Sequence, residues 1–339
     1  MTVRRWQVGA AFALLAALAL GVWWRLSPRR GAETQPARPR VVLSLPFGTT
    51  PDAVGRSVGL DGLAYGPLAF AVHGGTVAVA DTYRGRVLWL DRGRPSGFRG
   101  LGDALLEDVV WSARDHGWLA VDNRNLAVWL VGPAGARRLV TVPEPRGTSR
   151  AIWHLWVDNR GDILLEVLTL GRGRLTTEFE EYGPDGRPAA QSEAVLKRLA
   201  TREGPGTGVA ARVESMALGP GGDFYVLTAG PDDRTRTVLC WRPDATLAGR
   251  VQVRFPRAVH QAVLLGVGRN GALFLGADLG GRQGLVEVTD AAGRVEHMVA
   301  VPPEPVRAAV YGRVTSDGSL YLVENTPDAY RLVRWTWRR

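Results

Sequence analysis

The sequence predicts an all-β protein, a six-bladed β-propeller of four-stranded blades that is preceded by one transmembrane helix. Three observations lead to this prediction. A strand–turn–strand unit recurs six times, the spacing of the units matches that of propeller blades, and a lone strand at the start complements a missing strand at the end.

The repeated unit is an apolar strand, a tight turn that contains glycine, and a second short apolar strand. Apolar runs bounded by Gly, Pro, Asp and Asn are typical of β-strands. The turn glycines follow one another at intervals of 42, 44, 61, 49 and 47 residues, and the long interval contains an insertion at 192–208. The six glycines are Gly75, Gly117, Gly161, Gly222, Gly271 and Gly318.

The two ends of the chain predict how the ring closes. A third strand follows in each unit and a fourth in several, but the sixth unit stops at Arg339 after only three strands. The lone strand Val41–Pro46 would supply the missing fourth, so that no unpaired edge is left between the first and last blades. Two separate β-sandwiches are the alternative, and they explain the even spacing less well.

Two segments resemble a known repeat family. Residues 81–87 (DTYRGRV) resemble the NHL pattern D-x-x-N-x-R-V, with Arg84 at the position of its Asn, and residues 156–165 (WVDNRGDILL) resemble the strand pair of such repeats. The resemblance implies an NHL-type or related six-bladed propeller from about Val41 onward.

The N-terminal region predicts a membrane anchor. Residues 6–24 are 19 uncharged residues, and as a helix they would span about 28 Å, close to the thickness of the hydrocarbon core. We therefore expect a signal-anchor at 1–26, a linker at 27–40 and the propeller at 41–339, outside the cytoplasmic membrane of a bacterium. A cleavable signal peptide is the alternative.

Charge and cysteine content exclude other classes. The formal net charge is +9, but residues 1–40 contribute +6, so the predicted propeller is nearly neutral. This distribution argues against a nucleic-acid partner. Cys240 is the only cysteine, which excludes an intramolecular disulfide, and its apolar strand predicts an inert thiol.

A ring of acids is the candidate binding face. The second strand of five units ends in an acid, and superposed blades would place these groups on one face, where they could gather a cation such as Ca²⁺ or a basic partner. The alternative is that each carboxylate accepts backbone N–H bonds in the following turn or pairs with an arginine. The five residues are Asp81, Asp122, Glu166, Asp278 and Glu324.

Other side chains of the inner strands are weaker candidates. Resemblance to six-bladed lactonases would imply a divalent metal held near the channel by a Glu, an Asn and an Asp, but only Glu214 and Asp108 lie near inner-strand starts. His154 and His260 lie beside inner strands and could face the channel or be structural. Trp111 and several other tryptophans could fill the space between blades or offer a stacking surface.

The expected function is therefore non-catalytic. We expect a membrane-anchored propeller that binds a protein, cell-wall or small-molecule partner and has no catalytic residues, cofactor or resident metal. A metal-dependent lactonase or related hydrolase is the alternative, and because many functions occur on propellers, the site must decide between them.

Overall fold

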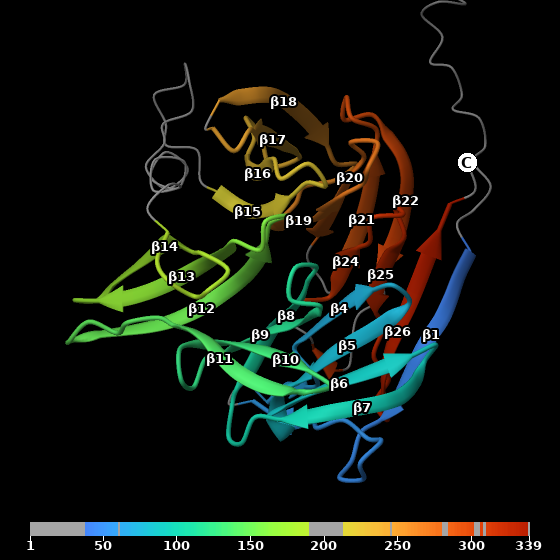
Figure 1. The fold of residues 1–339 in the computed structure, drawn as a ribbon. Helices are drawn as coiled ribbons and strands as arrows, with labels where there is room; N and C mark the ends of the chain where they lie inside the picture. Colours follow the sequence, from blue (N-terminus) through green and yellow to red (C-terminus); the bar gives the residue numbers. More distant parts are fainter. Residues whose placement is uncertain are drawn as a thin grey trace, which may run out of the picture. The chain divides into compact units, whose positions relative to one another are not determined.

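The structure, a computed structural model, confirms the all-β six-bladed propeller with four-stranded blades (Figure 1). It describes residues 38–59, 62–189, 213–244, 246–279, 284–301, 306–307 and 310–337. Each blade is an antiparallel sheet whose first strand lies nearest the centre of the ring.

The strands of the blades follow one another along the chain. Blade 1 contains β4 (Ala69–His73), β5 (Thr76–Asp81), β6 (Arg86–Asp91) and β7 (Arg94–Gly100). Blade 2 contains β8 (Leu106–Ser112), β9 (Gly117–Asp122), β10 (Ala127–Gly132) and β11 (Gly135–Thr141). Blade 3 contains β12 (Thr148–Val157), β13 (Ile163–Gly171) and β14 (Arg174–Tyr182).

The second half of the ring repeats this order. Blade 4 contains β15 (Val213–Leu218), β16 (Phe224–Ala229), β17 (Thr235–Trp241) and β18 (Leu247–Arg254). Blade 5 contains β19 (Gln261–Val267), β20 (Leu273–Asp278), β21 (Gly284–Thr289) and β22 (Val295–Val301). Blade 6 contains β24 (Gly312–Val314), β25 (Leu320–Val323), β26 (Ala329–Thr336) and β1 (Arg38–Pro46).

The ring closes as the two ends of the chain predict. β1 pairs antiparallel with β26 from Arg38 opposite Thr336 to Pro46 opposite Ala329. The strand begins three residues before the predicted Val41, so residues 38–40 belong to the blade and not to a linker. Leu43 and Tyr330, both buried, join this pair of strands to the core of blade 1.

Two features differ from six identical blades. Blade 3 has three strands in the part of the chain that the structure describes, and the insertion predicted at 192–208 lies outside the described residues. A small extra sheet joins β2 (Ser57–Val58), β3 (Ala64–Tyr65) and β23 (Val306–Arg307).

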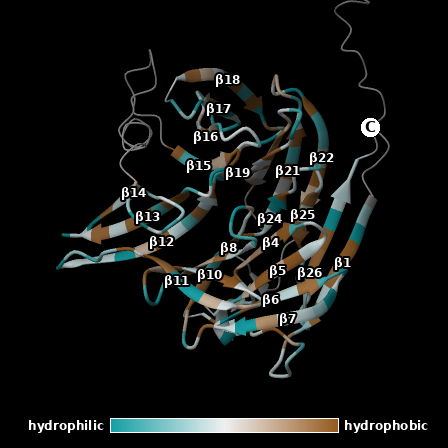
Figure 2. Cartoon of the chain, viewed as in Figure 1, coloured by the Kyte–Doolittle hydropathy of each residue, from teal (hydrophilic) through white to brown (hydrophobic). Residues whose placement is uncertain are grey.

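The core lies between neighbouring blades. Alternate residues of each strand face the two adjacent sheets, and Figure 2 shows the resulting mixture of apolar and polar positions along the strands. Between blades 2 and 3, for example, Leu119 packs with Ile152 and Leu165, and all three are fully buried. Burial of such side chains on both faces of each sheet holds the inner strands in place around the centre.

The turn glycines behave as predicted in five of six units, with φ between 78° and 88°. The exception is the turn between β8 and β9, where His116 takes the left-handed conformation with φ 48°. Gly117 instead begins β9, where a Cβ would lie 2.9 Å from the side chain of Leu130. This glycine is therefore required for packing within the blade.

The predicted anchor at residues 6–24 lies outside the described residues. Within the ranges given above, no helix combines the length and hydrophobicity needed to cross a membrane.

Candidate functional site

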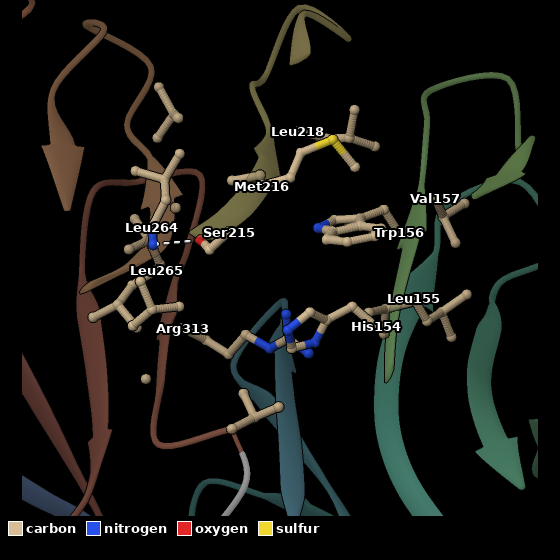
Figure 3. Close-up of a pocket in the computed structure, with 18 of the residues that line it drawn as sticks. His154, Leu155, Trp156, Val157, Ser215, Met216, Leu218, Leu264, Leu265 and Arg313 are labelled. Carbon is tan, nitrogen blue, oxygen red and sulfur yellow. Dashed lines mark hydrogen bonds between the residues drawn. The ribbon is translucent and has the colours of Figure 1, made fainter. Parts of the chain in front are cut away.

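A pocket lies at the centre of the ring, with a volume of ≈ 320 Å³. The inner strands of blades 2 to 6 line it, namely β8, β12, β15, β19 and β24. Figure 3 shows side chains from several of these strands converging on the same space. Most of them are apolar, and the few polar groups therefore decide what the pocket can do.

Arg313 supplies the positive charge of the pocket. It begins on β24 in blade 6 and reaches across the centre, where Nη2 donates a hydrogen bond to the Asp108 carboxylate and Nε donates to the carbonyl of Phe70 at 3.4 Å. Nη1 has no acceptor among the described residues. The guanidinium is thus held from two sides and keeps one nitrogen for a ligand.

Asp108 holds this arrangement together from blade 2. Its side chain is 1 % exposed. Besides Arg313, it accepts hydrogen bonds from the backbone N–H of Val109 at 2.8 Å and of Leu155 at 3.0 Å. One carboxylate therefore links blade 2 to blades 3 and 6, and it fixes the backbone next to His154.

Ser215 plays the corresponding structural part in blade 4. Its hydroxyl oxygen accepts a hydrogen bond from the N–H of Leu264 on β19, at 2.7 Å (Figure 3). Like Asp108, Ser215 follows a shift of register in its strand. Both residues thus satisfy a backbone N–H on the inner strand of the next blade.

His154 lies beside Arg313 in the pocket, and Figure 3 shows the two side chains directed toward one another. Burial lowers the pKa of His154; the Asp108 carboxylate opposes this shift, and the Arg313 guanidinium adds to it. The imidazole is therefore neutral at pH 7. Neither of its nitrogens has a hydrogen-bond partner among the described residues, so one can accept a proton from a bound molecule.

Aromatic side chains form rigid parts of the wall. Trp111 has the ring of His73 stacked on it at a centroid distance of 4.4 Å, and the edge of Trp118 lies 4.8 Å away. Trp156 meets the ring of His154 edge to face at 5.5 Å. These contacts fix the orientation of both tryptophans before any ligand binds.

The remaining histidines and the cysteine do not line this pocket. His260 is exposed, and His297 stacks on Trp337. His73 and His116 lie at a second cavity between blades 1 and 2. Burial raises the pKa of the Cys240 thiol, which agrees with its predicted inertness.

Two acids of the predicted ring bind donors of the protein itself. Asp81 pairs with Arg86 at 2.9 Å and accepts the N–H of Gly55 at 2.8 Å; these contacts oppose the burial that raises its pKa. The carboxylate of Asp122 accepts bonds from three backbone N–H groups and from the side chains of Asn125 and Trp129. Both carboxylates thus make the contacts expected of structural acids, which are bonds from backbone N–H groups and, for Asp81, an ion pair with an arginine.

The other three acids of the ring have environments that differ from one another. Burial raises the pKa of Glu166 to about 7, and this residue lies opposite His154 across the β12–β13 pair. Asp278 is exposed and Glu324 is half-buried. No three His, Cys, Asp or Glu side chains form a metal-binding group in the described ranges. Ligand binding by the ring stays a prediction.

The sequence Val-Asp-Asn-Arg occurs twice, at 121–124 and at 157–160, and the two copies form unrelated turns. Asp122 ends β9, whereas Asp158 follows β12 and accepts the N–H groups of Arg160 and Asp162 at 2.8 and 2.9 Å. Since one turn joins second to third strands and the other joins first to second, they lie on opposite faces of the ring.

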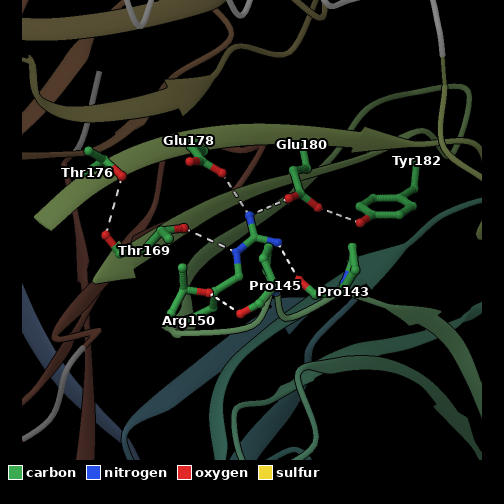
Figure 4. Close-up of polar contacts among 9 residues, drawn as sticks. Pro143, Pro145, Arg150, Thr169, Thr176, Glu178, Glu180 and Tyr182 are labelled. Carbon is green, nitrogen blue, oxygen red and sulfur yellow. Dashed lines mark hydrogen bonds and ion pairs between the residues drawn. The ribbon is translucent and has the colours of Figure 1, made fainter. Parts of the chain in front are cut away.

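Blade 3 contains a separate cluster of charges, drawn in Figure 4. Arg150 on β12 is buried and pairs with Glu178 and Glu180 of β14 at 2.9 and 2.5 Å. Glu180 also accepts a bond from the hydroxyl of Tyr182, which, together with burial, raises the pKa of that hydroxyl. Every one of these groups is satisfied within the blade, so the cluster is structural.

Glu287 on β21 is a buried acid of a different kind. It is 1 % exposed, and neither carboxylate oxygen has a hydrogen-bond partner among the residues that the structure describes. Burial raises its pKa to about 7 from an ordinary 4.5. Because the folded protein holds this proton more tightly than the unfolded chain, its contribution to stability is lost as the pH rises from about 4.5 to 7.

We expect Glu287→Met to raise the free energy of unfolding by about 1–3 kcal/mol at pH 8. The gain should be much smaller at pH 5, where the acid is already protonated in the folded state. Urea unfolding at the two pH values measures the difference. The exposed Glu296→Met is the control and should give no gain; an equal gain at both pH values for Glu287→Met would contradict the pKa assignment.

The acids do not form the metal site that a lactonase resemblance would imply. Glu214 pairs with Arg236 at 2.7 Å, and the oxygens of Asp108 are taken by backbone N–H groups and Arg313. No asparagine lines the central pocket in the described part of the chain. The donor set of this pocket therefore does not fit a divalent cation.

The chain is similar to several solved structures. No family model and no curated protein matches the chain. Among solved structures, a gluconolactonase is similar with a TM-score of 0.49 and 12% identity, over 90% of this chain and 94% of that one. A gluconolactonase from Xanthomonas campestris has a TM-score of 0.49 and 16% identity, over 91% of this chain and 99% of that one. A luciferin-regenerating enzyme has a TM-score of 0.48 and 11% identity, over 83% of this chain and 95% of that one.

Two expectations are corrected by this comparison. We expected a non-catalytic protein, whereas the similar structures are those of proteins named as enzymes. The expectation of no cofactor is not supported either. The NHL-type resemblance is not confirmed.

Proposed function

We propose that the chain is a hydrolase that cleaves a carboxylic ester bond, in a lactone or an open ester, in the central pocket. The observation that carries the proposal is that a neutral His154 lies beside the free Nη1 of Arg313 in a pocket whose other side chains are chiefly apolar. A hydrolase needs a base for water and a donor for the developing oxyanion, and these are the two groups present.

Arg313 would bind the carbonyl oxygen of the substrate. Its Nη1 donates to that oxygen, and the positive charge stabilises the negative charge that develops there as water adds. Asp108 and the carbonyl of Phe70 accept hydrogen bonds from the guanidinium and so hold it in a fixed position. Preorganisation of this kind is worth more in a site shielded from water than at the surface.

His154 would transfer the proton. The imidazole takes a proton from the attacking water as the new C–O bond forms, and then gives it to the leaving alkoxide as the ester C–O bond breaks. The products are one carboxylate and one alcohol, which are parts of a single molecule when the substrate is a lactone. Since the donor set of the pocket does not fit a metal, no step is assigned to one.

The proposed location is outside the cytoplasmic membrane. The uncharged run at 6–24 and the charges that flank it support an N-terminal anchor.

The pH profile of His154 tests the proposal. With purified full-length protein, we expect kcat/KM for lactone hydrolysis to be flat between pH 7 and 8 and to fall with acid through a pKa below 6.5, since the protonated imidazole cannot act as a base. His154→Gln should lower kcat/KM by about 10²–10⁴-fold and abolish that acid limb. The exposed His260→Gln is the control. Full activity of His154→Gln would refute the proposed role.

A further inference from the structure

We infer that the substrate is an apolar lactone or ester, one with an alkyl substituent, and not a polyhydroxylated sugar lactone. The inference rests on the proposed function and concerns what the rest of the pocket accepts. It differs from what the names of the structurally similar gluconolactonases would suggest.

The first argument is the chemistry of the wall. Among the described lining residues, His154 and Arg313 are the only ionisable groups apart from the hydroxyl of Tyr311. The other side chains are chiefly large and apolar, and they come from all five lining strands. They include Trp111, Trp156, Met216, Leu218, Leu264 and Leu265.

The second argument is that two backbone N–H groups of the inner strands are not available to a ligand. Ser215 accepts the N–H of Leu264, and Asp108 accepts the N–H of Leu155, so two backbone donors on the inner strands are taken. The Tyr311 hydroxyl lies against β20, where a Cβ on Gly276 would come within 1.7 Å of it. Each hydroxyl of a sugar lactone that was buried without a partner would cost about 1–3 kcal/mol.

The third argument is the layout of the pocket. Figure 3 shows Arg313 and His154 together, with Trp156 and Met216 to one side of them and Leu264 and Leu265 to the other. A carbonyl bound to Arg313 thus leaves the remainder of a ligand against apolar side chains. The volume of ≈ 320 Å³ is at the small end of the range for ligand pockets, which fits a single ring with a short alkyl chain.

The test compares three lactones of the same ring size: unsubstituted δ-valerolactone, its alkyl derivative δ-decalactone, and δ-gluconolactone. We expect kcat/KM to rise roughly three- to fourfold for each methylene that the wall buries, and to be lowest for gluconolactone. A preference for gluconolactone over δ-decalactone would overturn the inference while leaving ester hydrolysis intact.

A variant of the wall makes the test specific. Leu265→Gln replaces a half-buried leucine of the wall with an amide of similar size, so it should reduce the preference for δ-decalactone over δ-valerolactone by at least about tenfold. Leu247→Gln, at a residue that is 42 % exposed and outside the pocket, is the matched control and should leave the preference unchanged. An unchanged preference in Leu265→Gln would count against an alkyl-binding wall.

Binding without turnover separates this inference from the proposed function. The alkyl-substituted δ-lactam resists hydrolysis, and its binding can be followed by fluorescence of Trp111 and Trp156. Tighter binding of the alkyl lactam than of the unsubstituted lactam supports the apolar site, even if no lactone is hydrolysed and the proposed chemistry fails. Equal or weaker binding of the alkyl lactam would overturn the inference.

Discussion

Replacing Arg313 with Met is expected to lower kcat/KM for lactone hydrolysis by about 10²–10³-fold, the usual cost of losing one donor to a developing oxyanion. The pocket offers no second cation among its described lining residues, so nothing replaces the lost charge. Arg313→Lys should have a kcat/KM between those of the native protein and Arg313→Met. A guanidinium can bind Asp108 and the substrate through different nitrogens of one rigid plane, whereas an ammonium has a single nitrogen.

The same variant should change the titration of His154 in a defined direction. The Arg313 guanidinium lowers the pKa of His154, so its removal should raise that pKa and move the acid limb of the pH profile to higher pH. Titration of the imidazole by NMR measures the shift independently of turnover. Arg254→Met removes a surface arginine that pairs with Asp232 and is the control. An unshifted pKa would show that the two side chains are not neighbours.

The fold could be predicted from the sequence because its signals are local. Each blade is built from hairpins between residues close in the chain, and turn glycines such as Gly161 and Gly271 mark them directly. Even the closure of the ring was predictable, since one unit lacked a strand and the strand from Val41 to Pro46 was left over. The strand begins at Arg38 and not at Val41, because residues 38–40 also pair with β26. These residues are arginine and proline, so hydrophobic patterning does not reveal that they belong to the strand.

The candidate site was less predictable, because its contacts join residues far apart in the sequence. Arg313 and Asp108 are separated by 205 residues, and Arg313 was not among the predicted site residues. A signal was present, since an arginine within an inner strand (YGRVT) must reach a partner or a ligand across the channel. The acid ring was more visible in the sequence, but Asp81 and Asp122 bind backbone N–H groups and side chains of the protein itself.

Asp108→Asn is expected to be the most destabilising of the pocket variants, at about 3–5 kcal/mol, because it breaks a buried ion pair. The carboxylate faces three donors: two backbone N–H groups and Arg313. An asparagine must direct its own NH₂ group at one of them, whichever way the amide is turned. Asp158→Asn is the matched control, since Asp158 also accepts two N–H groups and contacts an arginine, but in a turn outside the pocket.

The titration of His154 distinguishes a purely structural role of Asp108 from a role in positioning the reacting groups. The Asp108 charge raises the pKa of His154, so Asp108→Asn should lower that pKa and move the acid limb of the pH profile to lower pH, opposite to Arg313→Met. In the double variant, the pKa of His154 should lie between its values in the two single variants. The double variant should also lose less free energy of unfolding than the two single variants lose in sum, because one of the three donors facing the new amide is gone. The proposed hydrolysis depends on an imidazole that lies between an anion and a cation. If the pKa of His154 shifted in the same direction in both single variants, this arrangement would be contradicted.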